Sequence, residues 1–145
     1  NLALLLKMGL GYPSNYSRAL KWAWLSQLSG NPKAAKVSED LLSIVPKETQ
    51  DNVRENVLSI LSARMKKSDR GAILQKAQFH LKVLDEPDYI AAYALTALGA
   101  AIGLERAVEL RNEIEGELEP EDLMLAQMQA AELFSGFDWS ETEKQ

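Results

Sequence analysis

The chain has 145 residues, 46% of them hydrophobic, and its formal net charge at pH 7 is −5. This length and composition favour a single domain with one continuous core. The absence of cysteine excludes disulfides, thiolate metal sites and cysteine nucleophiles, and is compatible with the cytoplasm and the periplasm alike. The longest nearly apolar run, 91–104, is shorter than the roughly 20 residues that span a bilayer, so we expect no membrane insertion.

The charge is unevenly distributed along the sequence. Residues 1–87 carry 13 basic and 8 acidic side chains, whereas residues 88–145 carry 3 basic and 13 acidic ones. Solvated helix faces are the simplest interpretation of this asymmetry. Electrostatic selection of a partner, or head-to-tail self-association, is the alternative.

Glycine, proline and capping residues divide the first part of the chain into helices. A helix over 2–8 is predicted to end in the Gly-rich segment 9–13, and Asn15 is predicted to cap the next helix, which ends at Gly30. Three further helices are predicted over 32–44, 46–65 and 70–84. Their predicted inward residues are Ala34, Val37, Leu41 and Ile44, then Val53, Val57, Ile60 and Leu61, then Ile73, Ala77 and Leu81, with Phe79 beside them.

The second part continues the pattern. The helix over 89–102 has no charged residue, so we expect it to be the most enclosed element. The next helix, 104–118, is predicted to bury Ala107, Leu110 and Ile114. The last begins at Pro120, with a core side made of Leu123, Ala126, Ala130 and Phe134. No segment alternates with period two, so the predicted fold is all-α. Residues 137–145 form an acidic tail, in which Phe137 and Trp139 are expected to cover the last helix.

Two stretches of the chain match without a gap at one constant spacing, which we call the repeat offset. Placing Asn15 on Asp88 superposes Tyr16 on Tyr89, Ala19 on Ala92, Leu25 on Leu98, Gly30 on Gly103 and Ala34 on Ala107. The repeat offset is the distance in sequence from residue 15 to residue 88. It equals two units of about 36 residues, which is within the range of helical-pair repeats. The sequence therefore predicts a helical repeat domain over 1–136, with about four antiparallel helix pairs. Repeat scaffolds usually bind partners rather than catalyse reactions.

The two copies contain residues that resemble the pattern of a known repeat family. The first copy has Gly9-x-Gly11, Asn15-Tyr16, Ala19, Trp22, Gly30 and Ala34; the second has Phe79, Asp88-Tyr89, Ala92-Tyr93, Gly103 and Ala107. They resemble the Sel-one-like repeat family, which is related to the tetratricopeptide repeats. The segment 111–131 is similar to the closing segments common in bacterial members.

The resemblance implies a right-handed α-α superhelical solenoid that acts as a non-enzymatic scaffold. A protein or peptide partner would bind in a groove lined by the first helix of each pair. The groove residues implied are Lys36, Asp40, Ser43, Gln75, Gln78, Lys82, Glu109 and Asn112. Trp24 is a further candidate, because it lies off the repeat pattern and suits the core and the groove equally.

Other functions have weaker support in the sequence. A hydrolase would need carboxylates such as Glu109 and Glu113, but two Glu on one exposed helical rim lack the burial that separates acid and base roles. The basic cluster 64–70 is an alternative anion or nucleic-acid site, although the pI is about 5.0. His80, the single histidine, is interpreted as a packing residue. No metal site, cofactor or phosphate-binding loop is predicted.

The beginning of the sequence is apolar and lacks a polar turn before it. We expect Leu4, Leu5 and Leu6 to form an exposed patch there, because internal solenoid repeats leave apolar surface for a neighbour. Self-association through this patch, and further repeats upstream in the natural protein, are the corresponding expectations.

Overall fold

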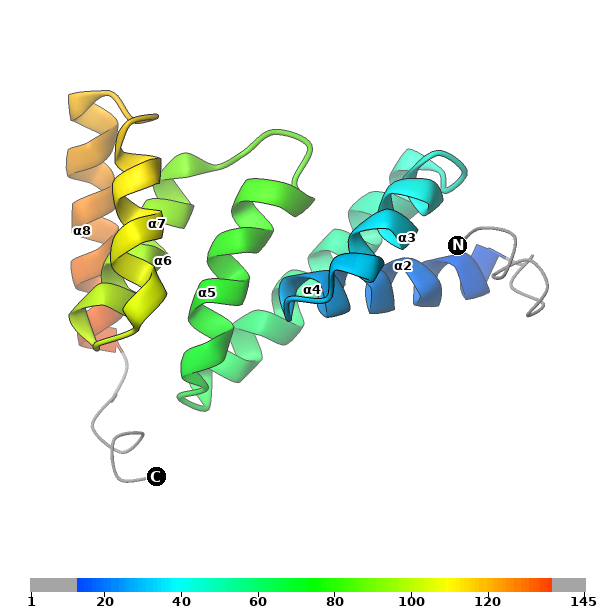
Figure 1. Ribbon diagram of the computed structural model, residues 1–145, viewed down its shortest axis with the longest axis horizontal. Coiled ribbons are helices and arrows are strands. Elements are labelled where there is room, and N and C mark those ends of the chain that lie inside the picture. The colour runs from blue at the N-terminus through cyan, green and yellow to red at the C-terminus, as the bar shows by residue number, and fades with distance from the viewer. Residues whose placement is uncertain (1–12, 137–145) are drawn as a thin grey trace. The chain divides into compact units, whose positions relative to one another are not determined.

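The computed structural model describes residues 13–136, with side chains described from residue 16 onward. This part of the chain is all-helical, as predicted, and contains no strand (Figure 1). Its elements are α2 (Pro13–Leu28), α3 (Pro32–Leu42), α4 (Lys47–Lys66), α5 (Arg70–Gln78), the π-helical segment η1 (Phe79–Val83), α6 (Tyr89–Ala101), α7 (Glu105–Glu115) and α8 (Pro120–Gly136). The expected helix at 2–8, the patch at Leu4–Leu6 and the docking of Phe137 and Trp139 lie outside the described residues.

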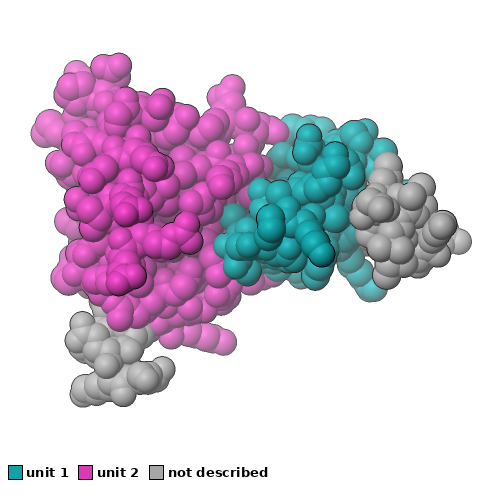
Figure 2. All heavy atoms as spheres, in the orientation of Figure 1, with its two compact units in different colours: residues 1–59 teal, residues 60–145 magenta. Residues whose placement is uncertain are grey.

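The chain divides into two compact units, residues 1–59 and 60–145 (Figure 2). Unit 1 contains α2, α3 and most of α4, and unit 2 contains the end of α4 and all later elements. A single repeat domain over 1–136 stays a prediction.

In unit 1, α2 packs against α3 through small and branched apolar side chains. Leu20 and Ala23 of α2 are fully buried, as are Ala34 and Leu41 of α3. The Ser38 hydroxyl of α3 donates a hydrogen bond to Gln27 Oε1 at 2.9 Å, which links the two helices through their polar edge. Asn31 caps α3 by accepting the Lys33 backbone N–H at 3.0 Å.

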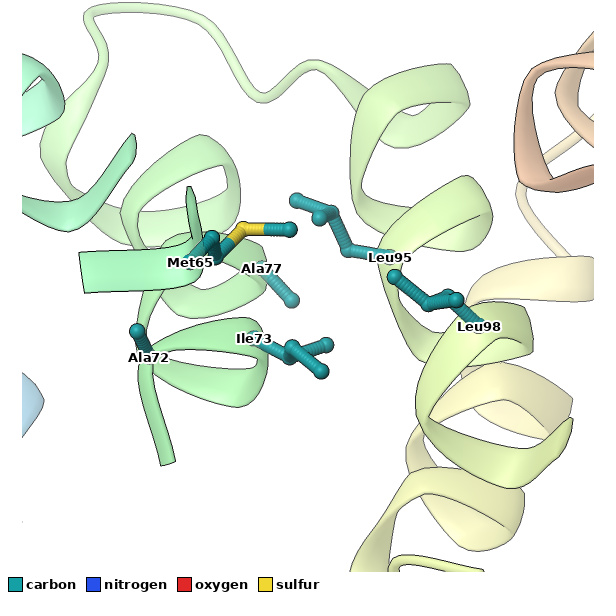
Figure 3. Close-up of a cluster of buried hydrophobic side chains, with 6 residues drawn as sticks. All are labelled: Met65, Ala72, Ile73, Ala77, Leu95 and Leu98. Carbon is teal, nitrogen blue, oxygen red and sulfur yellow. The ribbon is translucent and has the colours of Figure 1, made fainter. Parts of the chain in front are cut away.

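In unit 2, α6 is the central helix and contacts α5, α7 and α8. It buries seven of its residues, including the continuous run 92–96, which agrees with the expectation that this is the most enclosed helix among the described elements. One core cluster joins the end of α4, α5 and α6: the side chains of Met65, Ile73 and Ala77 face Leu95 and Leu98 (Figure 3). A second cluster joins Ala92 and Tyr93 of α6 to Ile114 of α7 and Ala126 of α8.

The repeat offset recurs in the backbone. It relates the first and last residues of α3 to those of α7, and the first residue of α4 to that of α8. It also relates Gly30 to Gly103, which are the described glycines with positive φ, at 101° and 90°. This left-handed conformation closes a helix at little cost only when the residue is glycine.

The turns that contain these glycines also share their hydrogen bonds. The N–H groups of Ser29, Gly30 and Asn31 donate to the carbonyls of Leu25, Gln27 and Ser26, and those of Ile102, Gly103 and Leu104 donate to Leu98, Ala100 and Gly99. The starts of α4 and α8 match as well, because Gln50 N–H donates to Pro46 and Leu123 N–H to Glu119, each at 2.9 Å. The repeat offset therefore reflects one local geometry used twice.

Three expectations are corrected. α2 begins at Pro13, so Asn15 lies inside the helix rather than at its cap; proline suits the first helical turn because its missing N–H needs no partner there. Ile44 is 41% exposed, because α3 ends at Leu42 and the stripe does not continue. Phe134, predicted to face the core, is 50% exposed.

Candidate functional site

A pocket of about 440 Å³ lies in unit 2 between α5 with η1, α6 and α8. Its lining residues are Lys76, His80, Ala91, Ala94, Leu95, Gln129, Glu132 and Leu133. α6 supplies small apolar side chains, which leave room beside the helix. α5, η1 and α8 supply the polar groups, so the pocket combines an apolar wall with a few polar side chains, as binding sites usually do.

The π-helical segment η1 positions His80 on this pocket. Leu84 N–H donates to the Phe79 carbonyl, five residues back, and Asp88 N–H donates to the His80 carbonyl at 2.9 Å. Phe79 is buried in the core, and the His80 ring meets it edge to face, with centroids 5.5 Å apart. The histidine is therefore held by packing.

Burial disfavours the charged forms of both titratable bases in the pocket. Desolvation lowers the pKa of Lys76. Desolvation also lowers the pKa of His80; the carboxylate of Asp88 partly opposes this effect and the ammonium of Lys76 adds to it. The buried Nδ1 atom of His80 has no hydrogen-bond partner among the described residues. Burial therefore favours the neutral form of the His80 imidazole, which shares the pocket with the Lys76 amine.

This arrangement is suited to binding a polar group that carries an apolar portion. Lys76 and Gln129 can donate hydrogen bonds, Glu132 can accept them, and the alanines with Leu95 and Leu133 can contact carbon atoms. The sequence interpretation missed this pocket, because it treated His80 as a packing residue. The available signal was the spacing of Lys76 and His80, which places two bases one helical turn apart.

The predicted groove residues divide between the units. On α3, Lys36 forms an ion pair with Asp40 at 3.6 Å, and the Ser43 hydroxyl donates to the Asp40 carbonyl at 2.6 Å. On α5, Gln75 Oε1 accepts a hydrogen bond from Arg64 at 2.7 Å, and the buried Gln78 Oε1 has no partner among the described residues. Lys82 on η1 and both Glu109 and Asn112 on α7 are exposed. None of these residues lines the pocket of Lys76 and His80.

Trp24, included among the partner-binding candidates, is a core residue. Only 2% of its surface is exposed, and the guanidinium of Arg54 lies over its ring, 5.2 Å from the centroid. Arg54 also forms an ion pair with Asp51 at 2.9 Å. The burial follows from geometry, because Trp24 points to the side of α2 that the core occupies, whereas Trp22 points outward and is exposed.

The structure also places the residues that were considered for a hydrolase site and for an anion or nucleic-acid site. Glu109 and Glu113 are exposed on α7. Within the basic cluster 64–70, Arg64 forms an ion pair with Asp69 at 2.9 Å, and Arg70 donates to the carbonyl of Ile102. Among the described residues there is no group of three or more His, Asp or Glu that could hold a metal ion. No helix between residues 13 and 136 is long and apolar enough to cross a membrane.

A second, smaller pocket of about 230 Å³ lies in unit 1. Ser17, Arg18 and Lys21 of α2 line it together with Asn52, Val53 and Asn56 of α4.

Comparison with known proteins gave no match to a family model, to a curated protein or to a solved structure.

Proposed function

We propose that the chain is a non-enzymatic scaffold that binds a protein or peptide partner through helical repeats. The observation that carries this proposal is the shared geometry of the two turns at Gly30 and Gly103, with helix boundaries that the repeat offset relates to each other. Repeated helical units stack because each buries an apolar face against its neighbour, and the stack presents a long surface. A right-handed α-α superhelical solenoid of the Sel-one-like kind is the arrangement that we propose for these units.

The residues proposed for partner contact lie on the polar sides of α3 in unit 1 and of α5 with η1 and α7 in unit 2. Lys36, Lys82, Glu109 and Asn112 are exposed on helices whose other sides are buried. Exposed, chemically varied side chains on rigid helices suit recognition, because the helices hold them in place before binding and so reduce the entropy lost on association.

The test is a charge reversal with a matched control. Lys36→Glu combined with Lys82→Glu changes the proposed surface, and Lys66→Glu combined with Lys67→Glu changes the net charge equally at exposed positions outside it. Gln78 is left unchanged, because its side-chain oxygen is buried. Affinity for a partner recovered by affinity capture is measured by titration.

We expect the first variant to bind about tenfold more weakly or worse, and the control to bind like the wild type. Undiminished binding by the Lys36 and Lys82 variant would show that this surface is not the contact site.

A further inference from the structure

The solvent-facing side of α8 carries large apolar side chains. Met124 and Met128 are 65% and 60% exposed, and Phe134 and Leu125 are 50% and 45% exposed. Leu125, Met128, the exposed Ala131 and Phe134 follow one another at every third position, and Met124 lies one turn before Met128. Residues three and four apart are neighbours on a helix surface, so these side chains form a row that winds about halfway around α8, with Met124, Met128 and Ala131 at its centre and Leu125 and Phe134 at its two edges. A contiguous apolar surface of this kind marks an interaction site more often than scattered single residues do.

The helix that corresponds to α8 shows that the fold does not require these residues. At the repeat offset, Met124, Leu125 and Met128 correspond to Asp51, Asn52 and Glu55 of α4. All three α4 residues are exposed and polar, as expected for a helix surface in water. A helix in this repeat position therefore folds with a polar outer side, and the apolar outer side of α8 needs another explanation.

The position of Phe134 indicates what kind of element would cover it. Phe134 corresponds to Leu61 of α4, which is fully buried. One turn beyond Leu61, Met65 packs against Ala72 and Ile73 of α5, and Arg64 Nη1 donates to Gln75 Oε1 of the same helix at 2.7 Å. In the first copy, the helix α5 thus packs against the end of α4. By analogy, a helix is the kind of element expected to cover Phe134.

The negative charge around α8 indicates that the helix covering it is basic. Residues 104–136 carry nine acidic and two basic side chains, and α8 itself has Glu121, Asp122 and Glu132 but no basic residue. Acidic side chains at the edge of an apolar surface attract lysine and arginine on a partner. Methionine side chains adapt to differently shaped apolar partners, because they are unbranched and flexible.

We propose that the α8 apolar face, consisting of Met124, Leu125, Met128 and Phe134, binds a basic amphipathic helix of a partner protein. The apolar side of that helix contacts the α8 apolar face, and its basic residues pair with Glu121, Asp122 and Glu132. This surface is separate from the residues proposed for the groove on α3, α5 and α7, so each can fail without the other.

The test uses the full chain and a fluorescein-labelled synthetic helix of about 18 residues, in which Leu occupies one face and Lys the other. Two control peptides have the same Leu and Lys in scrambled order, and Glu in place of Lys. Fluorescence anisotropy is measured with the wild type, with Met124→Asp/Met128→Asp, and with Val108→Asp as a control at an exposed apolar position on α7. Because aspartate adds negative charge, lost binding by the double variant reports lost apolar contact.

We expect saturable binding of the amphipathic basic peptide alone, with affinity reduced about tenfold or more in the double variant and unchanged in Val108→Asp. Met124→Leu/Met128→Leu should bind like the wild type, and Met124→Ser/Met128→Ser should repeat the loss if the aspartate variant unfolds. Equal binding of the scrambled peptide, or wild-type affinity in the double variant, overturns the proposal. A wild-type dimer in sedimentation velocity that Met128→Asp dissociates would assign the face to a second copy and also overturn it.

Discussion

His80 links a single residue to the pH dependence of stability. Its pKa in the folded chain lies below the ordinary value, first because burial disfavours the imidazolium. The unfolded chain, with a histidine pKa near 6.5, therefore binds more protons than the folded chain as the pH falls through that value. The contribution of His80 to the free energy of unfolding is therefore fully present above about pH 6.5, and it is lost as the pH falls below that value.

We predict that the free energy of unfolding decreases between pH 7.5 and 5.5, and that His80→Gln reduces this slope. The sequence contains one histidine, so the change in slope can be assigned to it. Urea denaturation at a series of pH values measures the slope. A variant whose slope equals that of the wild type would show that His80 is not desolvated in the folded chain.

The two glycines with positive φ give a second prediction at the scale of the residue. A Cβ at Gly30 would meet no atom within 4 Å, so the cost of Gly30→Ala arises from its φ of 101° alone. We expect Gly30→Ala and Gly103→Ala each to lower the free energy of unfolding by about 1 kcal/mol or more. Gly116→Ala, at a φ of −64°, is the control and should be neutral or slightly stabilising. Equal effects at all three positions in thermal denaturation would contradict the turn geometry.

Among the elements, α6 packs tightly against the start of α7 at Gly99. A Cβ at this position would lie 3.0 Å from the Ala107 Cβ and 3.2 Å from Leu104 Cδ1. Gly99→Val would force the two helices apart, and we expect a loss of about 1–3 kcal/mol in the free energy of unfolding. Ala101→Val adds the same side chain at an exposed position of α6 and is the matched control. If both variants have the same midpoint in chemical denaturation, this result would show that α6 and α7 do not pack closely at Gly99.

The helix boundaries followed from the sequence where a local signal fixes them. Gly30, Pro32 and Asp88 mark helix ends and starts through backbone geometry that neighbouring helices do not change. The π-helical segment η1 was not predicted, because no residue type specifies the wider turn. The pocket at Lys76 and His80 was missed for a related reason, since it depends on how side chains of α5 with η1, α6 and α8 come together.

The apolar stripes were predicted correctly near the middle of a helix and less well at its ends. Ala126, Ala130 and Phe134 repeat every four residues, and each step of four rotates about 40° because the helix has 3.6 residues per turn. Ala126 is fully buried, Ala130 is half-buried and Phe134 is 50% exposed, as this rotation requires. The sequence alone does not show where along such a series the neighbouring helix ends.

For the whole molecule, the central claim is that repeated helices form a scaffold that binds a partner. A photo-crosslinking residue at Lys82 or Asn112 lies within the proposed groove surface, and one at Glu55, exposed on α4, lies outside it. Each variant is irradiated in an extract, and adducts are identified by mass spectrometry. The account predicts one discrete protein crosslinked from Lys82 and Asn112 and not from Glu55. No discrete adduct from the first two positions, or the same adduct from Glu55, would contradict it.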